Sequence, residues 1–260
     1  MALLLLIFLF LINESRLAVV DGHWLRFFDS SGWFPSAGQF NLWPMLLATV
    51  LATLGALVLA VPMGLAAALF VSFFAPAPLA STFRRLLMLL AGIPSVVYGL
   101  WGLTVLVPLI TRVAPPGASL LAAMLILAVM ILPTVALTSE AALRTVPVSY
   151  WRGGQALGLS AQAILLKIAL PAARPGILAG VLLATTRALG ETMAVLMVAG
   201  NVVQVPGSIF DSVRVLTANI ALEMAYATDA HRASLYVSSL MLTLVVVAIA
   251  LLGRRLEAKQ

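Results

Sequence analysis

The stretch GILAGVLLATTRALGETMAVLMVA, residues 176–199, is a long apolar run that contains two charged residues, Arg187 and Glu191. Its length fits a membrane-spanning helix, because about 20 apolar residues in a helix cross a hydrocarbon core of about 30 Å. An unpaired charge at the bilayer centre costs at least about 2.5–3.5 kcal/mol. The stretch therefore predicts a membrane span together with a polar interaction that offsets this cost.

The composition of the whole chain agrees with a membrane protein. Of its 260 residues 63% are hydrophobic and 9% are charged, whereas a soluble domain carries about 25% charged residues. Cysteine is absent and the two histidines, His23 and His231, lie far apart, so we expect no disulfide, no metal site and no bound cofactor. The net charge of +6 is scattered between apolar runs. It forms no basic patch, and we expect no nucleic-acid binding.

Five charge-poor runs are long enough to cross a membrane. We place these spans at 45–74, 86–111, 118–138, 176–199 and 233–252. A sixth run, ALLLLIFLFLI, ends at Ile12 and is too short at about 1.5 Å per residue, so we expect the true start of the chain to lie upstream. The sequence thus predicts an all-α integral membrane protein, a polytopic bundle of about six transmembrane helices.

The orientation follows from the arginines and lysines, which are retained on the cytoplasmic side. The connections that hold most of them are 75–85, 139–175 and the C-terminal tail. We predict that these lie inside, with the C-terminus cytoplasmic, and that the loops near 13–43, 112–117 and 200–232 lie outside. In the last outer loop we expect most of the charged residues simply to be solvated, and contact with a docking protein is the alternative; they are Asp211, Arg214, Glu223, Asp229 and Arg232.

The segment 139–175 is long for a connection between spans and so has structure of its own. Between Tyr150 and Ile168 its apolar residues recur at helical spacing. The pattern predicts short helices at the membrane surface. An interfacial amphipathic helix without a partner is the simpler alternative.

The same segment contains Gly158, then nine residues, then Ile168-x-Leu170-Pro171. This spacing resembles the cytoplasmic signature of ABC importer permeases, EAA, three residues, Gly, nine residues, Ile-x-Leu-Pro. The family's EAA falls here on Arg152-Gly153-Gly154, whereas the literal Glu140-Ala141-Ala142 lies too far upstream. In that family the loop is the coupling helix that seats on an ATPase subunit, which implies an ATPase contact at Ala156, Leu157, Gly158, Ile168, Leu170 and Pro171.

Further segments resemble one branch of this family, the permeases of bacterial phosphate importers of the PstC type. They are 28–50, 61–76, GIPSVVYGLWGL (92–103) and RALGETMAVLMVAGN (187–201). The resemblance implies an ABC type I importer transmembrane domain at 44–252, in the inner membrane, with its coupling loop at 139–175. An incomplete first helix and a periplasmic loop (1–43) precede it, and a cytoplasmic tail (253–260) follows it.

The resemblance also implies the partners. They are a homologous permease subunit of the PstA type, two ATPase subunits, a periplasmic phosphate-binding protein and the surrounding membrane lipid. The chain has no GxxxxGK[ST] phosphate loop. We therefore expect ATP to be bound and hydrolysed by a partner, and the chain itself not to be an enzyme.

Arg187 and Glu191 are the only charged residues in the five predicted spans, and two interpretations stay open for them. At i and i+4 on one helix they can pair with each other and fix its packing. Alternatively, Arg187 donates to phosphate oxygens in the transport path, while Glu191 accepts from the phosphate hydroxyl, which sulfate lacks. Ser95 and Tyr98 can present hydroxyls along this path because Pro94 interrupts helical bonding; a plain kink is the alternative.

Two other functions remain open from the sequence. One is an ABC permease for another oxyanion, such as molybdate or sulfate. The other is a stand-alone secondary carrier or channel, although no internal repeat supports it. A membrane-embedded hydrolase lacks a recognisable set of nucleophile and base. Finally, Gly176-ILA-Gly180 has the small-xxx-small form that permits close helix packing in lipid.

Overall fold

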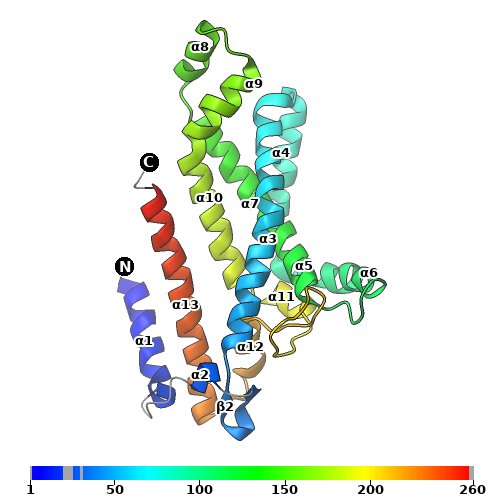
Figure 1. The fold of residues 1–260 in the computed structure, drawn as a ribbon, viewed down its shortest axis with the longest axis vertical. Helices are drawn as coiled ribbons and strands as arrows, with labels where there is room; N and C mark the ends of the chain where they lie inside the picture. The colour runs from blue at the N-terminus through cyan, green and yellow to red at the C-terminus, as the bar shows by residue number, and fades with distance from the viewer. Residues whose placement is uncertain (1, 20–25, 30–31, 258–260) are drawn as a thin grey trace. The chain divides into compact units, whose positions relative to one another are not determined.

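The computed structural model describes residues 2–19, 26–29 and 32–257, and Figure 1 shows that the chain is mainly helical. Lys259 and His23 lie outside the described residues. The chain packs as two compact units, each assembled from separate segments. Unit 1 comprises Met1–Ala56, Pro94–Leu127 and Ala188–Ala248; unit 2 comprises Leu57–Ile93, Ala128–Arg187 and Ile249–Gln260.

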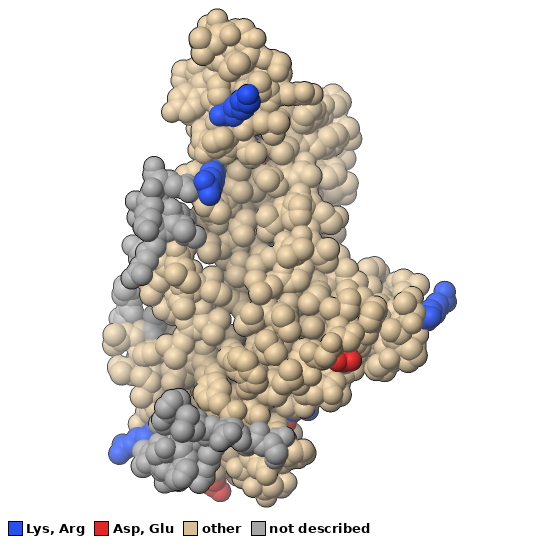
Figure 2. All heavy atoms as spheres, in the orientation of Figure 1, with Lys and Arg blue, Asp and Glu red and all other residues tan. Residues whose placement is uncertain are grey.

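Four helical segments are long and apolar enough to cross a membrane, and they are Trp43–Phe74, Leu120–Arg144, Ala161–Gly190 and Asp229–Gly253. The first joins α3 (Trp43–Leu69) to the π-helical turn η2 (Phe70–Phe74). The second is α7 (Leu120–Arg144), and the last lies within α13 (Asp229–Glu257). These segments overlap four of the predicted spans, so the prediction of a polytopic all-α membrane protein is confirmed. The face drawn in Figure 2 carries few charged side chains among its described residues, as contact with lipid requires.

The predicted span 86–111 is not one helix. Helix α4 (Ala77–Gly92) ends before Ile93, and the chain resumes as α5 (Ser95–Trp101), the π-helical turn η3 (Gly102–Leu106) and α6 (Val107–Thr111). Ile93 is extended, with φ −65° and ψ 129°, because the ring of Pro94 disfavours a helical residue before it. Together α4 and the helices after the break count as a fifth span only if the pair crosses the membrane once.

The predicted span 176–199 is also interrupted. Helix α10 (Leu170–Gly190) ends before Glu191, and the separate helix α11 (Met193–Val198) follows. Arg187 therefore lies in the last turn of α10, whereas Glu191 lies beyond its end. The prediction that the two side chains share one helix face is wrong, because Gly190 and the side-chain bonding of Glu191 favour a stop and a new start at this point.

The core of unit 1 gathers around a short hairpin. Strands β1 (Trp33–Phe34) and β2 (Gln39–Phe40) pair antiparallel, and the 3-10 turn η1 (Pro35–Ala37) and Gly38, at φ 67°, connect them. The hairpin packs with α2 (Arg26–Asp29), α12 (Leu216–Glu223) and the start of α13; the buried core includes Phe27, Trp33, Leu42, Met45, Leu216 and Leu235. Helix α1 (Ala2–Val19) extends beyond the apolar run that ends at Ile12, and Phe10 packs edge-on against Tyr236 of α13.

The core of unit 2 depends on close approach between α7 and α10. A Cβ atom at Gly176 would lie 2.7 Å from the Cβ of Ala142, and one at Gly180 would overlap the side chain of Thr138. Small residues such as glycine let helix backbones approach this closely. The predicted close packing through the two glycines is therefore confirmed.

Gly180→Ala is expected to lower the thermal midpoint of the purified chain by several degrees, because the added methyl must displace Thr138, and overpacking costs about 1–3 kcal/mol. Gly92→Ala is the matched control, since a Cβ at Gly92 meets nothing within 4 Å. Equal midpoints for the two variants would contradict a tight α7–α10 contact.

Candidate functional site

Glu191 occupies the break between α10 and α11 and holds two neighbouring segments of unit 1. Its carboxylate oxygen Oε1 accepts a hydrogen bond from the backbone N–H of Ala194 at 3.1 Å. Its backbone carbonyl accepts from the hydroxyl of Thr217, on α12, at 2.8 Å. The half-buried Glu191 thus caps the new helix and fixes it to α12.

A small cavity lies beside Glu191 within unit 1. Thr49, Thr53 and Thr217 contribute to its wall, and its volume is about 10 Å³. A cavity needs about 10–15 Å³ to hold one water molecule, and ligand pockets have about 300–1,000 Å³. In this conformation the cavity has room for one water molecule at most and is too small for an oxyanion.

The two helices that follow the breaks pack on each other in unit 1. A Cβ atom at Gly99 of α5 would lie 2.9 Å from the Cα of Ala194 and 2.8 Å from the sulfur of Met197. Tyr98 is buried, and Ser95 is half-buried in the first turn of α5. The structure therefore brings the helix that carries Ser95 and Tyr98 against the helix that Glu191 caps.

Arg187 belongs to unit 2, where its contact is a neutral one. Its Nη1 donates a hydrogen bond to the hydroxyl of Thr134, on α7, at 3.2 Å. Among the described residues of unit 2, the ion pairs join arginines to Glu140 and do not include Arg187. A guanidinium has five N–H donors, so most of the hydrogen-bonding capacity of Arg187 remains available to a ligand.

The predicted coupling residues fall into two groups in unit 2. Helix α8 (Val148–Ala156) and helix α9 (Ala161–Ile164) confirm the predicted short helices, and the turn between them exposes Ala156, Leu157 and Gly158. Gly158 has φ 73°, a left-handed conformation that favours glycine. Ile168 lies in the π-helical turn η4 (Leu165–Ala169), and Leu170 and Pro171 begin α10.

Sequence reasoning missed Glu140, a charged residue inside a long apolar helix. Helix α7 continues to Arg144, six residues beyond the predicted end of the span. Glu140 is 3% exposed and accepts from Arg84 Nε at 2.9 Å, while Arg144 Nη2 lies 3.0 Å from its carboxylate. The predicted span 118–138 ends two residues before Glu140, so this ion pair was not counted with Arg187 and Glu191. The i, i+4 spacing of Glu140 and Arg144 was the available signal.

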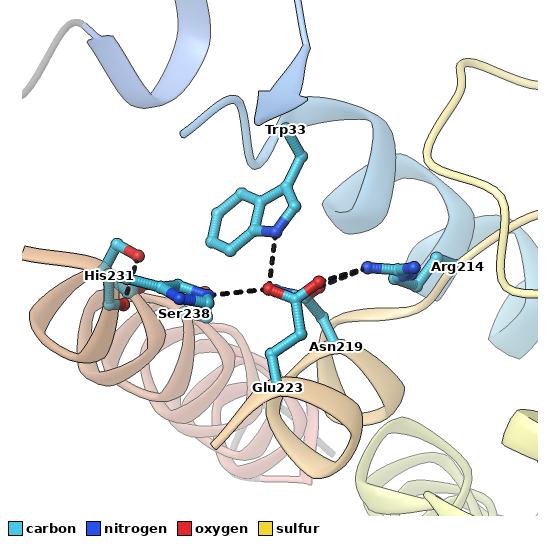
Figure 3. Close-up of polar contacts among 7 residues, drawn as sticks. Trp33, Arg214, Asn219, Glu223, His231 and Ser238 are labelled. Atoms are coloured by element: carbon cyan, nitrogen blue, oxygen red, sulfur yellow. Dashed lines mark hydrogen bonds and ion pairs between the residues drawn. The ribbon is translucent and has the colours of Figure 1, made fainter. Parts of the chain in front are cut away.

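Glu223 centres a second buried polar network, in unit 1, which Figure 3 shows. Its Oε1 accepts from Arg214 Nη1 at 2.6 Å, and its Oε2 accepts from the indole N–H of Trp33 at 2.8 Å. His231 Nε2 lies 2.8 Å from the same Oε2, and Arg214 also donates to Asn219 at 3.0 Å. The expectation of solvated charges is wrong for Arg214 and Glu223, because this network joins the hairpin, α12 and α13.

Glu223→Ala is expected to destabilise unit 1 by about 3–5 kcal/mol, because removing one partner of a buried ion pair leaves Arg214 uncompensated. The thermal midpoint of the purified chain measures the loss. Asp229→Asn is the matched control, since Asp229 is an exposed acid at the start of α13. A Glu223→Ala chain that melts with the control would show that the network contributes no stability.

The fold and the site define a class of protein. The chain is a multi-pass helical membrane protein in which two segments predicted to span the membrane are interrupted, and the helices after both breaks pack together in unit 1. Discontinuous helices of this kind are characteristic of membrane transport proteins, in which they form solute sites.

Comparison with known proteins identifies the family. Residues 60–259 match the family model described as "Binding-protein-dependent transport system inner membrane component", and the chain belongs to this family. It is 38% identical over 208 residues to the "Probable ABC transporter permease protein YqgH" of Bacillus subtilis, covering 78% of this chain and 67% of the relative. It is 32% identical over 274 residues to the "Phosphate transport system permease protein PstC" of Mesorhizobium japonicum, covering 93% and 84%.

A solved structure with the same fold is that of the inward-facing MetNI methionine ABC transporter. The TM-score is 0.63 at 21% identity, and the match covers 84% of this chain and 93% of the other. The predicted fold class and the family resemblance are therefore confirmed. The chain is a transport subunit and a multi-pass protein of the inner membrane.

Proposed function

We propose that this chain is the permease subunit of an ATP-driven importer that moves inorganic phosphate across the inner membrane. The observation that carries the proposal is the break after Gly190, which separates Arg187 from Glu191 and gives each a contact of its own. The likeness to a phosphate permease over 93% of the chain supports the choice of substrate.

Arg187 and Glu191 have complementary uses along a phosphate path. The guanidinium of Arg187 is held by one neutral hydroxyl and offers its other donors to phosphate oxygens. The carboxylate of Glu191 accepts from the backbone of Ala194 through Oε1, and its other oxygen can accept from a phosphate hydroxyl. Sulfate has no such hydroxyl at neutral pH, so a carboxylate disfavours it.

Passage of phosphate at Glu191 requires unit 1 to open. The adjoining cavity of about 10 Å³ has no room for the anion. Opening it requires α11 or α12 to move, and the bond between Thr217 and the backbone of Glu191 is one contact that such a movement breaks. Ser95 and Tyr98, on the helix packed against α11, are the hydroxyl groups we assign to the same path.

Coupling to ATP hydrolysis is assigned to the loop 139–175 of the transmembrane domain 44–252. The turn at Ala156, Leu157 and Gly158 seats in an ATPase subunit, while Ile168, Leu170 and Pro171 connect it to α10. Because the ATPase subunits are cytoplasmic, this assignment puts the loop 139–175 and the C-terminus on the cytoplasmic side of the membrane. The complete importer contains a PstA-type permease subunit, two ATPase subunits and a periplasmic phosphate-binding protein.

Arg187→Gln and Glu191→Gln are each expected to lower ATP-dependent uptake of labelled phosphate at least tenfold in vesicles that contain the co-expressed complex. The reason is the loss of charge-assisted bonds to the anion, worth about 1.5–3 kcal/mol each. Arg112→Gln, at an exposed loop position, is the control and should transport normally. Assembly of the complex is measured in parallel.

Uptake at wild-type rates in both variants would assign the two residues to packing. A wild-type complex that transports sulfate or molybdate but no phosphate would make the chain a permease for another oxyanion.

Glu191→Gln is also expected to reduce the ratio of phosphate uptake to sulfate uptake when delivery by the binding protein is bypassed. Equal rates for the two anions in the wild type would contradict the role of the carboxylate.

Leu157→Ser is expected to weaken co-purification of the ATPase subunit, because Leu157 is a 79% exposed apolar side chain at the proposed contact. Val113→Ser is the matched control, since Val113 is 78% exposed in a loop predicted to lie on the other side of the membrane. If both variants retain the ATPase equally well, the turn is not the contact. Uptake and ATP hydrolysis should fall together with the loss of the subunit.

A further inference from the structure

Unit 2 contains a pocket of about 480 Å³ that the transport path does not use. The π-helical turn η2, the start of α4, the end of α7 and the start of α8 form its wall. The volume lies within the range of about 300–1,000 Å³ that is typical of ligand pockets. The wall combines two arginines, Arg84 and Arg144, with the apolar side chains of Val148 and Trp151.

The two arginines are held in place by one buried carboxylate. Glu140 accepts from Arg84 Nε at 2.9 Å and 3.1 Å, and Arg144 Nη2 lies 3.0 Å from it. The three side chains carry two positive charges and one negative charge, so the wall keeps a net positive charge. The side chains of Arg84 and Arg144 are 27% and 59% exposed. These contacts use only part of each guanidinium, which has five donors, and the remaining N–H groups are available to an anion.

Two hydroxyl groups add to the polar part of the wall. Ser72 Oγ is buried and, among the described residues, has no hydrogen-bond partner. A buried hydroxyl without a partner is unfavourable, so a ligand that bonds to it is favoured. Ser81 Oγ donates to the backbone carbonyl of Pro78 at 2.8 Å and can still accept. Ser72 belongs to η2, and π-helical turns recur at functional sites.

We propose that this pocket binds a phosphate-bearing group. The phosphate oxygens accept from Arg84, Arg144 and Ser72, which lie on three separate segments. The guanidinium group matches the geometry of phosphate oxygens. Trp151 and Val148 cover whatever is attached to the phosphate. An anionic phospholipid headgroup and free inorganic phosphate share this chemistry, because both present phosphate oxygens. Basic pockets between membrane helices are known to bind such headgroups. Arg187 does not line this pocket. Binding of a phosphate group here is therefore independent of which anion the importer transports.

The test measures the fluorescence of Trp151 in the full chain, purified in a sugar-headgroup detergent that carries no phosphate. Inorganic phosphate and short-chain phosphatidylglycerol are titrated separately. The chain has five tryptophans, so the same titration of Trp151→Phe isolates the signal of Trp151. We expect a saturable change with at least one of the two probes, and the probe that produces it identifies the source of the phosphate group.

Arg144→Gln is expected to weaken this binding about tenfold, since one charge-assisted contact is lost while Arg84 still pairs with Glu140. Arg85→Gln is the matched control, because Arg85 is exposed on α4 but does not line the pocket. Ser72→Ala, which leaves the ion pairs intact, should also weaken binding. It replaces Arg144→Gln in the test if Arg144→Gln fails to fold.

Three results would overturn the proposal. The first is no Trp151-dependent change with either probe. The second is a fluorescence change for which neither Arg144→Gln nor Ser72→Ala weakens probe binding. The third is a fluorescence change for which Arg85→Gln weakens probe binding as much as Arg144→Gln does. Because the readout needs neither ATP nor uptake, failure of the phosphate-import proposal leaves this result interpretable.

Discussion

A helix that stops leaves backbone N–H and carbonyl groups without partners inside the helix, and where water does not reach them other protein groups must replace these bonds. The break after Gly190 meets this constraint through Glu191, which accepts from Ala194, and through Thr217, which donates to the carbonyl of Glu191. The break at Pro94 meets it differently, because proline has no N–H to satisfy. The two helices that follow these breaks then pack together at Gly99.

The same requirement for partners governs the buried carboxylates. Glu140 in unit 2 and Glu223 in unit 1 are both at least 94% buried, and each is bonded to an arginine. A buried carboxylate without a partner costs several kcal/mol, so these contacts fix the segments that supply them. In unit 1 they hold the hairpin to α12 and α13, and in unit 2 they hold α4 to α7. In both units, charged residues near helix ends serve as interior contacts.

Hydropathy located four of the long helical segments because their length reflects the thickness of the membrane. The motif around Gly158 located the exposed turn, since a left-handed glycine between short helices leaves a local signature. The sequence did not reveal which charges are buried, because burial also depends on segments that are distant in the chain. Glu140 accepts from Arg84, 56 positions away, and Glu223 accepts from Trp33, 190 positions away. The break at Glu191 was missed because apolar periodicity continues across it.

Helix α11 has only six residues, too few to be stable as an isolated helix. Its persistence depends on packing against α5 and on the single side chain that caps its first turn. Releasing a hydrogen bond to a charged acceptor costs about 1.5–3 kcal/mol, which corresponds to an uncapped population of about one molecule in ten to one in a hundred. Thermal motion alone therefore samples a state in which the first turn of α11 lacks its cap, so this end of the helix is its least stable part.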